Sequence, residues 1–276
     1  MNIYLSVDME GINGISSSSE VMPEGSEYSQ SRKLMSEEVN AVVEGAFAGG
    51  AKRVVVNDAH NTMTNIRFED LHPKAELISG LFKPLSMMEG IGENFDAVFL
   101  VGYHAGAGTP MGVLGHTFVA TNIFRKVKIN NSIANEAFIT GALAGFFNVP
   151  VKLLIGDRWV VEQSREFFPN AKFVAVKEGR GMFSSWYYPY EKTLKNICLA
   201  AQEAVSMSVS PFKLKSPINV QIEMATPAML DLSLLIADVR QVGDLIIEFT
   251  CENYLLAFKQ FMAISMLAGL AKNEVY

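Results

Sequence analysis

Apolar runs of strand length alternate with stretches of helical spacing along residues 1–206. Residues 2–7 and 53–57 are short β-rich runs, and in the intervening residues 31–49 the apolar positions recur every three or four residues, as on one face of a helix. A glycine pair then ends that helix. A strand, a helix and a second strand in this order predict a parallel pair joined by a right-handed crossover.

The same alternation continues along the chain and indicates the fold class. Residues 116–129 alternate apolar and polar side chains, which predicts a hairpin that turns near Arg125-Lys126. Together the patterns predict an α/β fold with an open, mainly parallel sheet and flanking helices. Further strands are expected at 75–79, 97–101, 151–155 and 172–176, and further helices at 132–147, 158–168 and 191–206.

A second, smaller unit is predicted at the carboxyl-terminal end. Residues 206–217 are polar and interrupted by prolines, as in a linker. We therefore predict an α/β domain over residues 1–206 and an α+β domain over residues 207–276, with the hairpin of residues 115–131 as a candidate to pack with the second unit. The elements of this unit are expected as strand, helix, strand and helix at 218–223, 227–235, 244–250 and 254–271.

Composition excludes several classes of function. A net charge of −6 and only 19% charged residues argue against a nucleic-acid-binding protein. The sequence has neither an apolar run of membrane-spanning length nor a basic leader followed by an apolar stretch. Cys198 and Cys251 lie far apart in apolar surroundings and are expected to be reduced thiols, so we expect a soluble, cytoplasmic protein. The 18 Phe and 14 Met favour subunit contacts and thus a homo-oligomer.

Titratable side chains follow three of the predicted strands. Asp8 and Glu10 follow the first strand and, being two residues apart, should point to one spot. Asp58 and His60 follow the second strand with the same spacing, and His104 follows the strand at 97–101. The carboxyl ends of parallel strands form the usual ligand-binding edge of a sheet. Because two neighbouring carboxylates repel unless a proton or a cation lies between them, this edge is a candidate metal site.

Two further residues join this group as candidates. Glu136 opens a predicted helix, where it either complements the helix dipole or projects into the site. His116 follows a glycine-rich loop and is a candidate proton-transfer group, a further ligand or a surface residue. Carboxylate and imidazole ligands without cysteine suit zinc best, with manganese or cobalt as alternatives, and two such cations favour hydrolysis. The candidate ligands are Asp8, Glu10, His60, His104 and Glu136.

The motifs around these residues resemble a known family. They are Ser6-Val7-Asp8-Met9-Glu10-Gly11-Ile12, Asn57-Asp58-Ala59-His60, Gly102-Tyr103-His104-Ala105, Gly115-His116-Thr117 and Glu136. In this order and spacing the sequence is similar to the zinc-dependent D-aminopeptidases encoded with dipeptide-transport operons. The resemblance implies two zinc ions per subunit held by residues 8, 10, 60, 104 and 136, with His116 as the catalytic residue. It also implies cleavage of an amino-terminal residue, preferably D-, from short peptides, and a ring-like homodecamer.

Other functions remain possible at this level. One is a different binuclear metallohydrolase, such as an amidase or a phosphoesterase, although few Lys or Arg residues lie near the motifs to hold a phosphate. Another is a non-catalytic peptide-binding or metal-storage protein, which would have no use for His116 as a proton carrier. The serines at 16–19 and the aromatic cluster at 186–188 lie where the resemblance is weakest, so substrate preference, D- or L-, is left open.

Overall fold

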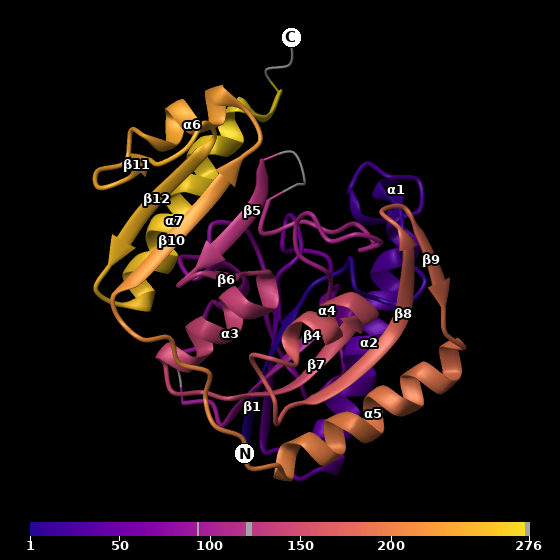
Figure 1. Cartoon of the computed structure of the whole chain (residues 1–276). Coiled ribbons are helices and arrows are strands. Elements are labelled where there is room, and N and C mark those ends of the chain that lie inside the picture. The colour runs from indigo at the N-terminus through magenta and orange to yellow at the C-terminus, as the bar shows by residue number, and fades with distance from the viewer. Residues whose placement is uncertain (93, 120–122, 274–276) are drawn as a thin grey trace.

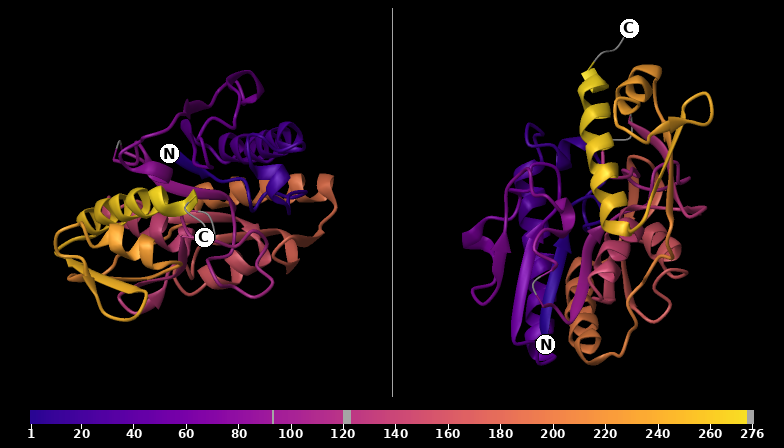
Figure 2. Two further views of the ribbon diagram at one scale, coloured as in Figure 1. Left: turned by 90° about the horizontal axis from the view of Figure 1, so that it is seen from above. Right: turned by 90° about the vertical axis from the view of Figure 1, so that its left-hand side faces the viewer.

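The structure is a computed structural model, and it describes residues 1–92, 94–119 and 123–273. Within these residues the chain forms a seven-stranded and a five-stranded sheet (Figure 1). In both views of Figure 2 the indigo and purple amino-terminal strands and the orange and yellow smaller sheet lie on opposite sides of the molecule. None of the described helices is long and apolar enough to cross a membrane.

The larger sheet is parallel except for its last strand, which pairs antiparallel with β8. The prediction of an α/β fold with a mainly parallel sheet is therefore confirmed. From one edge to the other the strands are β3 (Glu76–Ile78), β2 (Arg53–Asp58), β1 (Asn2–Val7), β4 (Ala97–Tyr103), β7 (Val151–Asp157), β8 (Lys172–Gly181) and β9 (Ser184–Tyr187).

Both faces of the central strands β2, β1, β4 and β7 are buried, which explains why these strands contain continuous apolar runs. Ile3 and Leu5 face a core built with α2 (Tyr28–Ala48) and α5 (Tyr190–Ser206). Tyr4 belongs to the core on the other face, which α3 (Glu136–Phe146) and α4 (Arg158–Ser164) cover. This second core continues without a break into the smaller sheet.

The smaller sheet is antiparallel throughout, and its central strand alternates buried and half-buried side chains. One face therefore packs on helices while the other meets solvent. In order the strands are β11 (Arg240–Gln241), β12 (Ile246–Cys251), β10 (Ile218–Met224), β5 (Phe124–Ile129) and β6 (Ser132–Ile133), accompanied by α6 (Pro227–Ser233) and α7 (Tyr254–Leu270).

The hairpin near residue 125 is the main error of the sequence-based prediction. Arg125 and Lys126 lie inside β5, and the turn falls at Asn130-Asn131, where both residues adopt positive φ. Both side chains of the basic pair are exposed between the buried Phe124 and Val127. The pairing with β10 shifts here and leaves Arg125 out of the register, as in a β-bulge, so the two adjacent charges mark an irregularity of the strand and not a turn. Part of the predicted first strand, residues 120–122, lies outside the described residues. β5 pairs with β10, whereas the division of the chain after residue 206 stays a prediction.

Two helix boundaries also differ from the prediction. The helix expected from residue 132 begins only at Glu136, because Ser132–Ile133 pair with β5 and Asn135 caps the helix by accepting a hydrogen bond from the Phe138 amide. The helix expected to reach Phe168 ends at Ser164. The remaining short elements are α1 (Ser18–Val21) and the 3₁₀ turns η1 (Phe68–Asp70), η2 (Ser86–Met88) and η3 (Ala271–Asn273).

Candidate metal centre

The carboxyl ends of β1, β2 and β4 meet at one edge of the larger sheet and hold the centre in register. The Asp8 amide donates to Val101 O at 2.8 Å, and the Ala59 amide donates to Val7 O at 2.8 Å, so pairing continues past each strand. A Cβ on Gly102, at φ +70°, would lie 2.1 Å from Asp8 O. Glycine at this position therefore allows the segments that carry Asp8 and His104 to touch.

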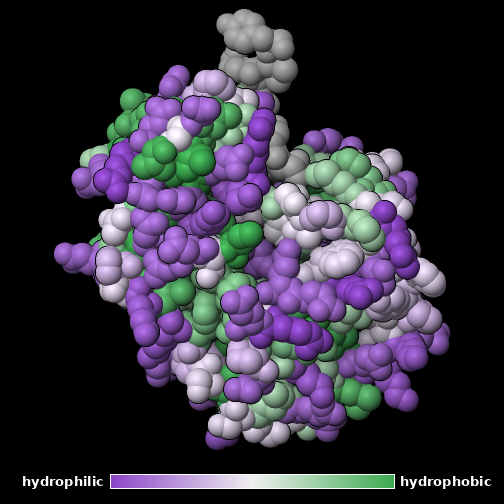
Figure 3. Space-filling model, in the orientation of Figure 1, coloured by the Kyte–Doolittle hydropathy of each residue, from purple (hydrophilic) through white to green (hydrophobic). Residues whose placement is uncertain are grey.

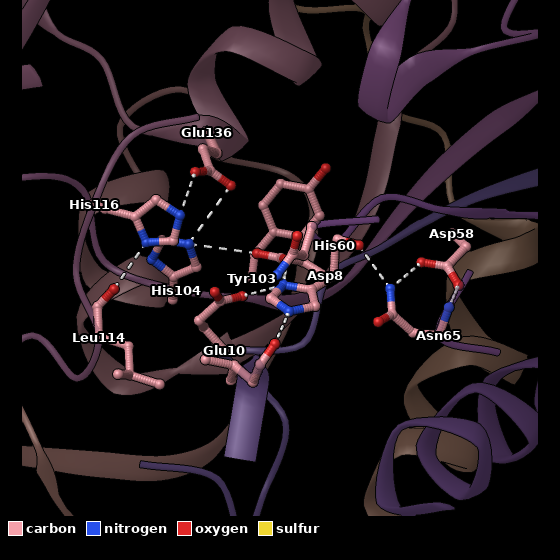
Figure 4. A network of polar contacts seen from close by, with 12 residues as sticks. Asp8, Glu10, Asp58, His60, Asn65, Tyr103, His104, Leu114, His116 and Glu136 are labelled. Atoms are coloured by element: carbon pink, nitrogen blue, oxygen red, sulfur yellow. Dashed lines mark hydrogen bonds and ion pairs between the residues drawn. The ribbon is translucent and has the colours of Figure 1, made fainter. Parts of the chain in front are cut away.

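The five candidate ligands converge on a buried spot (Figure 4). His60 Nδ1 lies 3.4 Å from Asp8 Oδ1 and 2.9 Å from Glu10 Oε2. His104 Nε2 lies 3.4 Å from Asp8 Oδ2 and 3.5 Å from Glu136 Oε2. Asp8 thus turns one oxygen to each imidazole and occupies the middle of the group. The structure brings together all five residues that the sequence proposed.

Backbone carbonyls orient each imidazole of the site. His60 Nε2 lies 2.7 Å from Val21 O, His104 Nδ1 lies 2.9 Å from Ala105 O, and His116 Nδ1 lies 2.9 Å from Leu114 O. A carbonyl only accepts, so in each ring this nitrogen carries a hydrogen and the other is left to bind a proton or a metal ion. These second nitrogens face the carboxylates, which is the arrangement of metal-binding histidines.

The electrostatics of the centre call for added positive charge. Burial and then the charge of Glu10 raise the pKa of Asp8 to about 7. Burial lowers the pKa of His104, but Glu136 and Asp8 outweigh it and raise this pKa to about 10. For the same reason Glu10 and Asp8 raise the pKa of His60 well above its usual value. The negative potential of three buried carboxylates therefore favours cations, either protons or metal ions.

The donor set fits divalent metal ions. Asp8 Oδ2 and His104 Nε2 are buried, and within the described residues neither has a hydrogen-bond partner. Buried polar atoms without partners are costly unless something binds them. Ligand atoms lie within 4.8 Å of one another in two groups, one of Asp8, Glu10 and His104 and the other of His104, His116 and Glu136. Oxygen and imidazole nitrogen without sulfur suit zinc in a hydrolytic site.

His116 differs from the five candidate ligands in its position. Its ring stacks on that of His104, with centroids 4.3 Å apart and planes at 21°. Its Nε2 lies 3.5 Å from Glu136 Oε1, and 16% of its side chain is exposed, whereas the five are buried. The preceding glycine-rich loop is fixed at its end, because the Leu114 amide donates to Met182 O at 2.8 Å. His116 therefore stands between the buried carboxylates and the cavity.

Asp58 does not join the centre, contrary to the expectation from its spacing to His60. Its carboxylate accepts hydrogen bonds from the Asn65 amide at 2.5 Å, from Asn65 Nδ2 at 2.8 Å and from the Ile66 amide at 2.8 Å. The side chain points away from the other carboxylates (Figure 4). It organises the connection that follows His60.

Two supporting residues were missed by the sequence reasoning. The buried Lys177 ammonium donates to the carbonyls of Glu10, Ile12 and Ile15 and so fixes the loop after β1. Asp157 accepts from the Ala105 amide at 2.8 Å and fixes the turn next to His104. Asp157 is the last residue of β7, and Lys177 directly follows the apolar run at 172–176, although β8 continues to Gly181. A polar residue at the end of an apolar run was the available signal.

A cavity of about 530 Å³ opens above the centre. Asp8, Glu10, Glu136, His60 and His116 lie along it, and Lys83 and Lys272 provide its cationic groups. Because methionine side chains adapt to different shapes, the apolar wall can accept varied side chains. That wall includes Met22, Met63, Met182, Met262, Met266, Phe82 and Phe183.

Comparisons with known proteins agree with this geometry. A D-aminopeptidase of Bacillus subtilis (strain 168) is 39% identical over 178 residues, which span 64% of this chain and 64% of that protein, just under two thirds of its length. The solved structure of the Zn-dependent D-aminopeptidase DppA from Bacillus subtilis, a self-compartmentalizing protease, is similar with a TM-score of 0.93 and 31% identity over 98% of both chains. A family model described as D-aminopeptidase matches residues 1–263. The chain therefore belongs to the D-aminopeptidase family.

Proposed function

We propose that the protein is a binuclear zinc aminopeptidase that removes the amino-terminal residue, preferably a D-residue, from short peptides or amino-acid amides. The observation that supports this most is the position of Asp8, whose two oxygens face His60 and His104 at 3.4 Å each. Such a carboxylate can bridge two cations. DppA, which is similar over almost its whole length, is Zn-dependent.

The five converging residues would hold the two zinc ions: Asp8, Glu10, His60, His104 and Glu136. Zinc, when bound, polarises a substrate carbonyl and makes bound water acidic enough to serve as a nucleophile near neutral pH. The negative potential that raises the pKa of His104 to about 10 would be neutralised by these two zinc ions.

His116 is the proposed proton carrier. The Leu114 carbonyl keeps the hydrogen on Nδ1, so Nε2 offers a lone pair on the side of Glu136. This nitrogen can accept a proton from the attacking water and return it to the departing amine. Its position at the cavity, partly exposed, suits this role better than a purely structural one.

A substrate screen tests the proposed reaction. The purified protein is stripped with a chelator and assayed with and without zinc on D-alaninamide, L-alaninamide, D-Ala-D-Ala, L-Ala-L-Ala and p-nitrophenyl phosphate. We expect zinc-dependent release of D-alanine and little turnover of the L-forms. Turnover of the phosphate ester alone would contradict the proposal and favour a phosphoesterase, with the cavity lysines as phosphate ligands.

We also propose that the protein assembles into a homo-oligomeric ring, a decamer, and acts in the cytoplasm, where free thiols such as Cys198 and Cys251 persist. DppA is self-compartmentalizing. Hydrophobic side chains gather over the region of α6 and β11 (Figure 3), and Leu235 and Leu270 are exposed. Light scattering should give a mass far above 30.3 kDa. A monomer at micromolar concentration would contradict the assembly.

A further inference from the structure

Lys83 stands at the side of the cavity next to the end of β2. Its ammonium donates hydrogen bonds to Asn57 Oδ1 at 2.6 Å and to Asp58 O at 2.5 Å. Asn57 and Asp58 close the strand that leads to His60. Lys83 is therefore anchored to the same segment that positions a candidate metal ligand.

An ammonium group has three hydrogens to donate, and these two bonds use two of them. Lys83 lines the cavity, so the third is available to a ligand there. Burial lowers the pKa of Lys83 to about 8, which still leaves the side chain mostly charged at neutral pH. A half-buried cation with a free donor is suited to a carboxylate.

The backbone around Lys83 is strained and tied down. Gly80, Phe82 and Ser86 have φ values of +106°, 59° and 50°, and a positive φ is uncommon for a bulky residue such as phenylalanine. The Gly80 amide and Ser79 Oγ both bond to Met63 O, at 2.7 and 3.0 Å. Such conformations persist where the surroundings impose them, and they cluster at ligand-binding segments. Here they hold Lys83 at the cavity wall.

Lys83 and residues of the centre line the same cavity at different places. The centre would hold the zinc ions, and Lys83 lies beside Asp58, two residues before His60. A short peptide whose amino end lies at the centre can therefore extend its carboxyl-terminal carboxylate along this cavity towards Lys83.

We propose that Lys83 binds the free carboxyl-terminal carboxylate of the substrate and so makes the protein selective for short peptides with an unblocked carboxyl end. This inference rests on the proposed aminopeptidase function for the identity of the reaction, but the carboxylate contact itself does not require turnover. It assigns the selectivity for a free carboxyl end to a residue outside the metal centre.

The test compares D-Ala-D-Ala with its carboxyl-terminal amide, which differ only in the carboxylate. In wild-type protein we expect a lower KM for the free acid. In Lys83→Met the ratio of kcat/KM for acid over amide should fall roughly tenfold or more, through KM, because a hydrogen bond to a charged group is lost. Lys83→Arg should keep most of the ratio. An equal loss for both substrates would mean that Lys83 only supports β2, and would overturn the inference.

Lys272→Met is the matched control, because Lys272 also lines the cavity but is exposed. It should keep the wild-type ratio; a fall in this variant and not in Lys83→Met would overturn the assignment. Calorimetric binding of both dipeptides to the same proteins separates this inference from the proposed function. Tighter binding of the acid that Lys83→Met abolishes supports the inference even if no variant shows turnover, whereas equal binding of acid and amide to wild-type protein contradicts it.

Discussion

β1 and β2 lie side by side in the larger sheet, and a pair of titratable residues two positions apart stands at the carboxyl end of each. At the end of β1 both members, Asp8 and Glu10, face the centre. At the end of β2 only His60 does, because Asp58 accepts three hydrogen bonds from Asn65 and Ile66. The register pairs Asp58 with Val7 and not with Asp8. The two aspartates are therefore offset by one position, and an offset of one residue turns a side chain to the other face of a sheet.

The free-energy cost of burying the carboxylate differs between Asp58 and Asp8. Asp58 is fully buried, and its charge is balanced by donors fixed in the following connection. Asp8 is almost as buried, but Oδ2 has no hydrogen-bond partner within the described residues. Leaving such an atom unpaired costs about 1 to 3 kcal/mol. Burial of Asp8 at the end of β1 is therefore unfavourable until a metal ion binds, whereas Asp58 at the end of β2 is already stabilised by its hydrogen bonds.

The largest effect is expected from Asp8→Ala. Removal of the central carboxylate should abolish binding of both zinc ions and lower kcat/KM by about a thousandfold or more, since zinc supplies the nucleophile. Metal analysis and turnover on one preparation measure this. Glu10→Ala is the control from the same strand end and should mainly weaken one site. Two tightly bound zinc ions in Asp8→Ala would refute the bridging position.

Asp58→Ala should lower the stability and leave zinc binding unchanged, whereas Asp8→Ala should abolish zinc binding. Three buried donors lose their acceptor, so the free energy of unfolding should fall by about 3 kcal/mol while the zinc content stays at the wild-type value. Chemical denaturation and metal analysis check both parts. Asp70→Ala removes an exposed aspartate from the same connection and should change the stability little. If Asp58→Ala lost zinc at unchanged stability, the contrast between the two strand ends would be wrong.

His116→Ala tests a residue that belongs to neither strand end and is expected to affect turnover alone. The variant should bind zinc and fold normally but lose about a hundredfold in turnover, as is typical when a general acid–base group is removed. Loss of zinc would instead make His116 a ligand, and near-normal turnover would remove it from the mechanism. His72→Ala is the control, because His72 stacks on Phe47 and is not among the residues that line the cavity.

The strands of the larger sheet except β9, and the five converging residues, could be predicted from the sequence. Each strand that leads to a candidate ligand is an apolar run buried on both faces, so its end is sharp and the residues after it are easy to place. Parallel pairing then brings the ends together without further information. His60 and His104 could be assigned to one site for this reason alone.

Features that depend on contacts between distant residues could not be predicted. Lys177 binds the carbonyl of Glu10, which lies 167 residues earlier. Lys83 binds Asn57, which lies 26 residues earlier, and the sequence around Lys83 does not indicate this partner. The turn was predicted near residue 125 because two consecutive basic residues interrupt the alternation of apolar and polar side chains, as a loop would. In each case the sequence shows the residue but not the partner that gives it a role.

Because main-chain carbonyls orient the histidines, substitutions can accumulate around them during evolution without changing the orientation of the rings. Val21 and Leu114 hold the rings of His60 and His116 through their backbone oxygens, while both residues also line the cavity. A carbonyl is the same in every amino acid, so mutation at either position can reshape the substrate pocket and leave the tautomers intact. Substrate specificity can therefore evolve through these two side chains while the orientation of His60 and His116 stays the same.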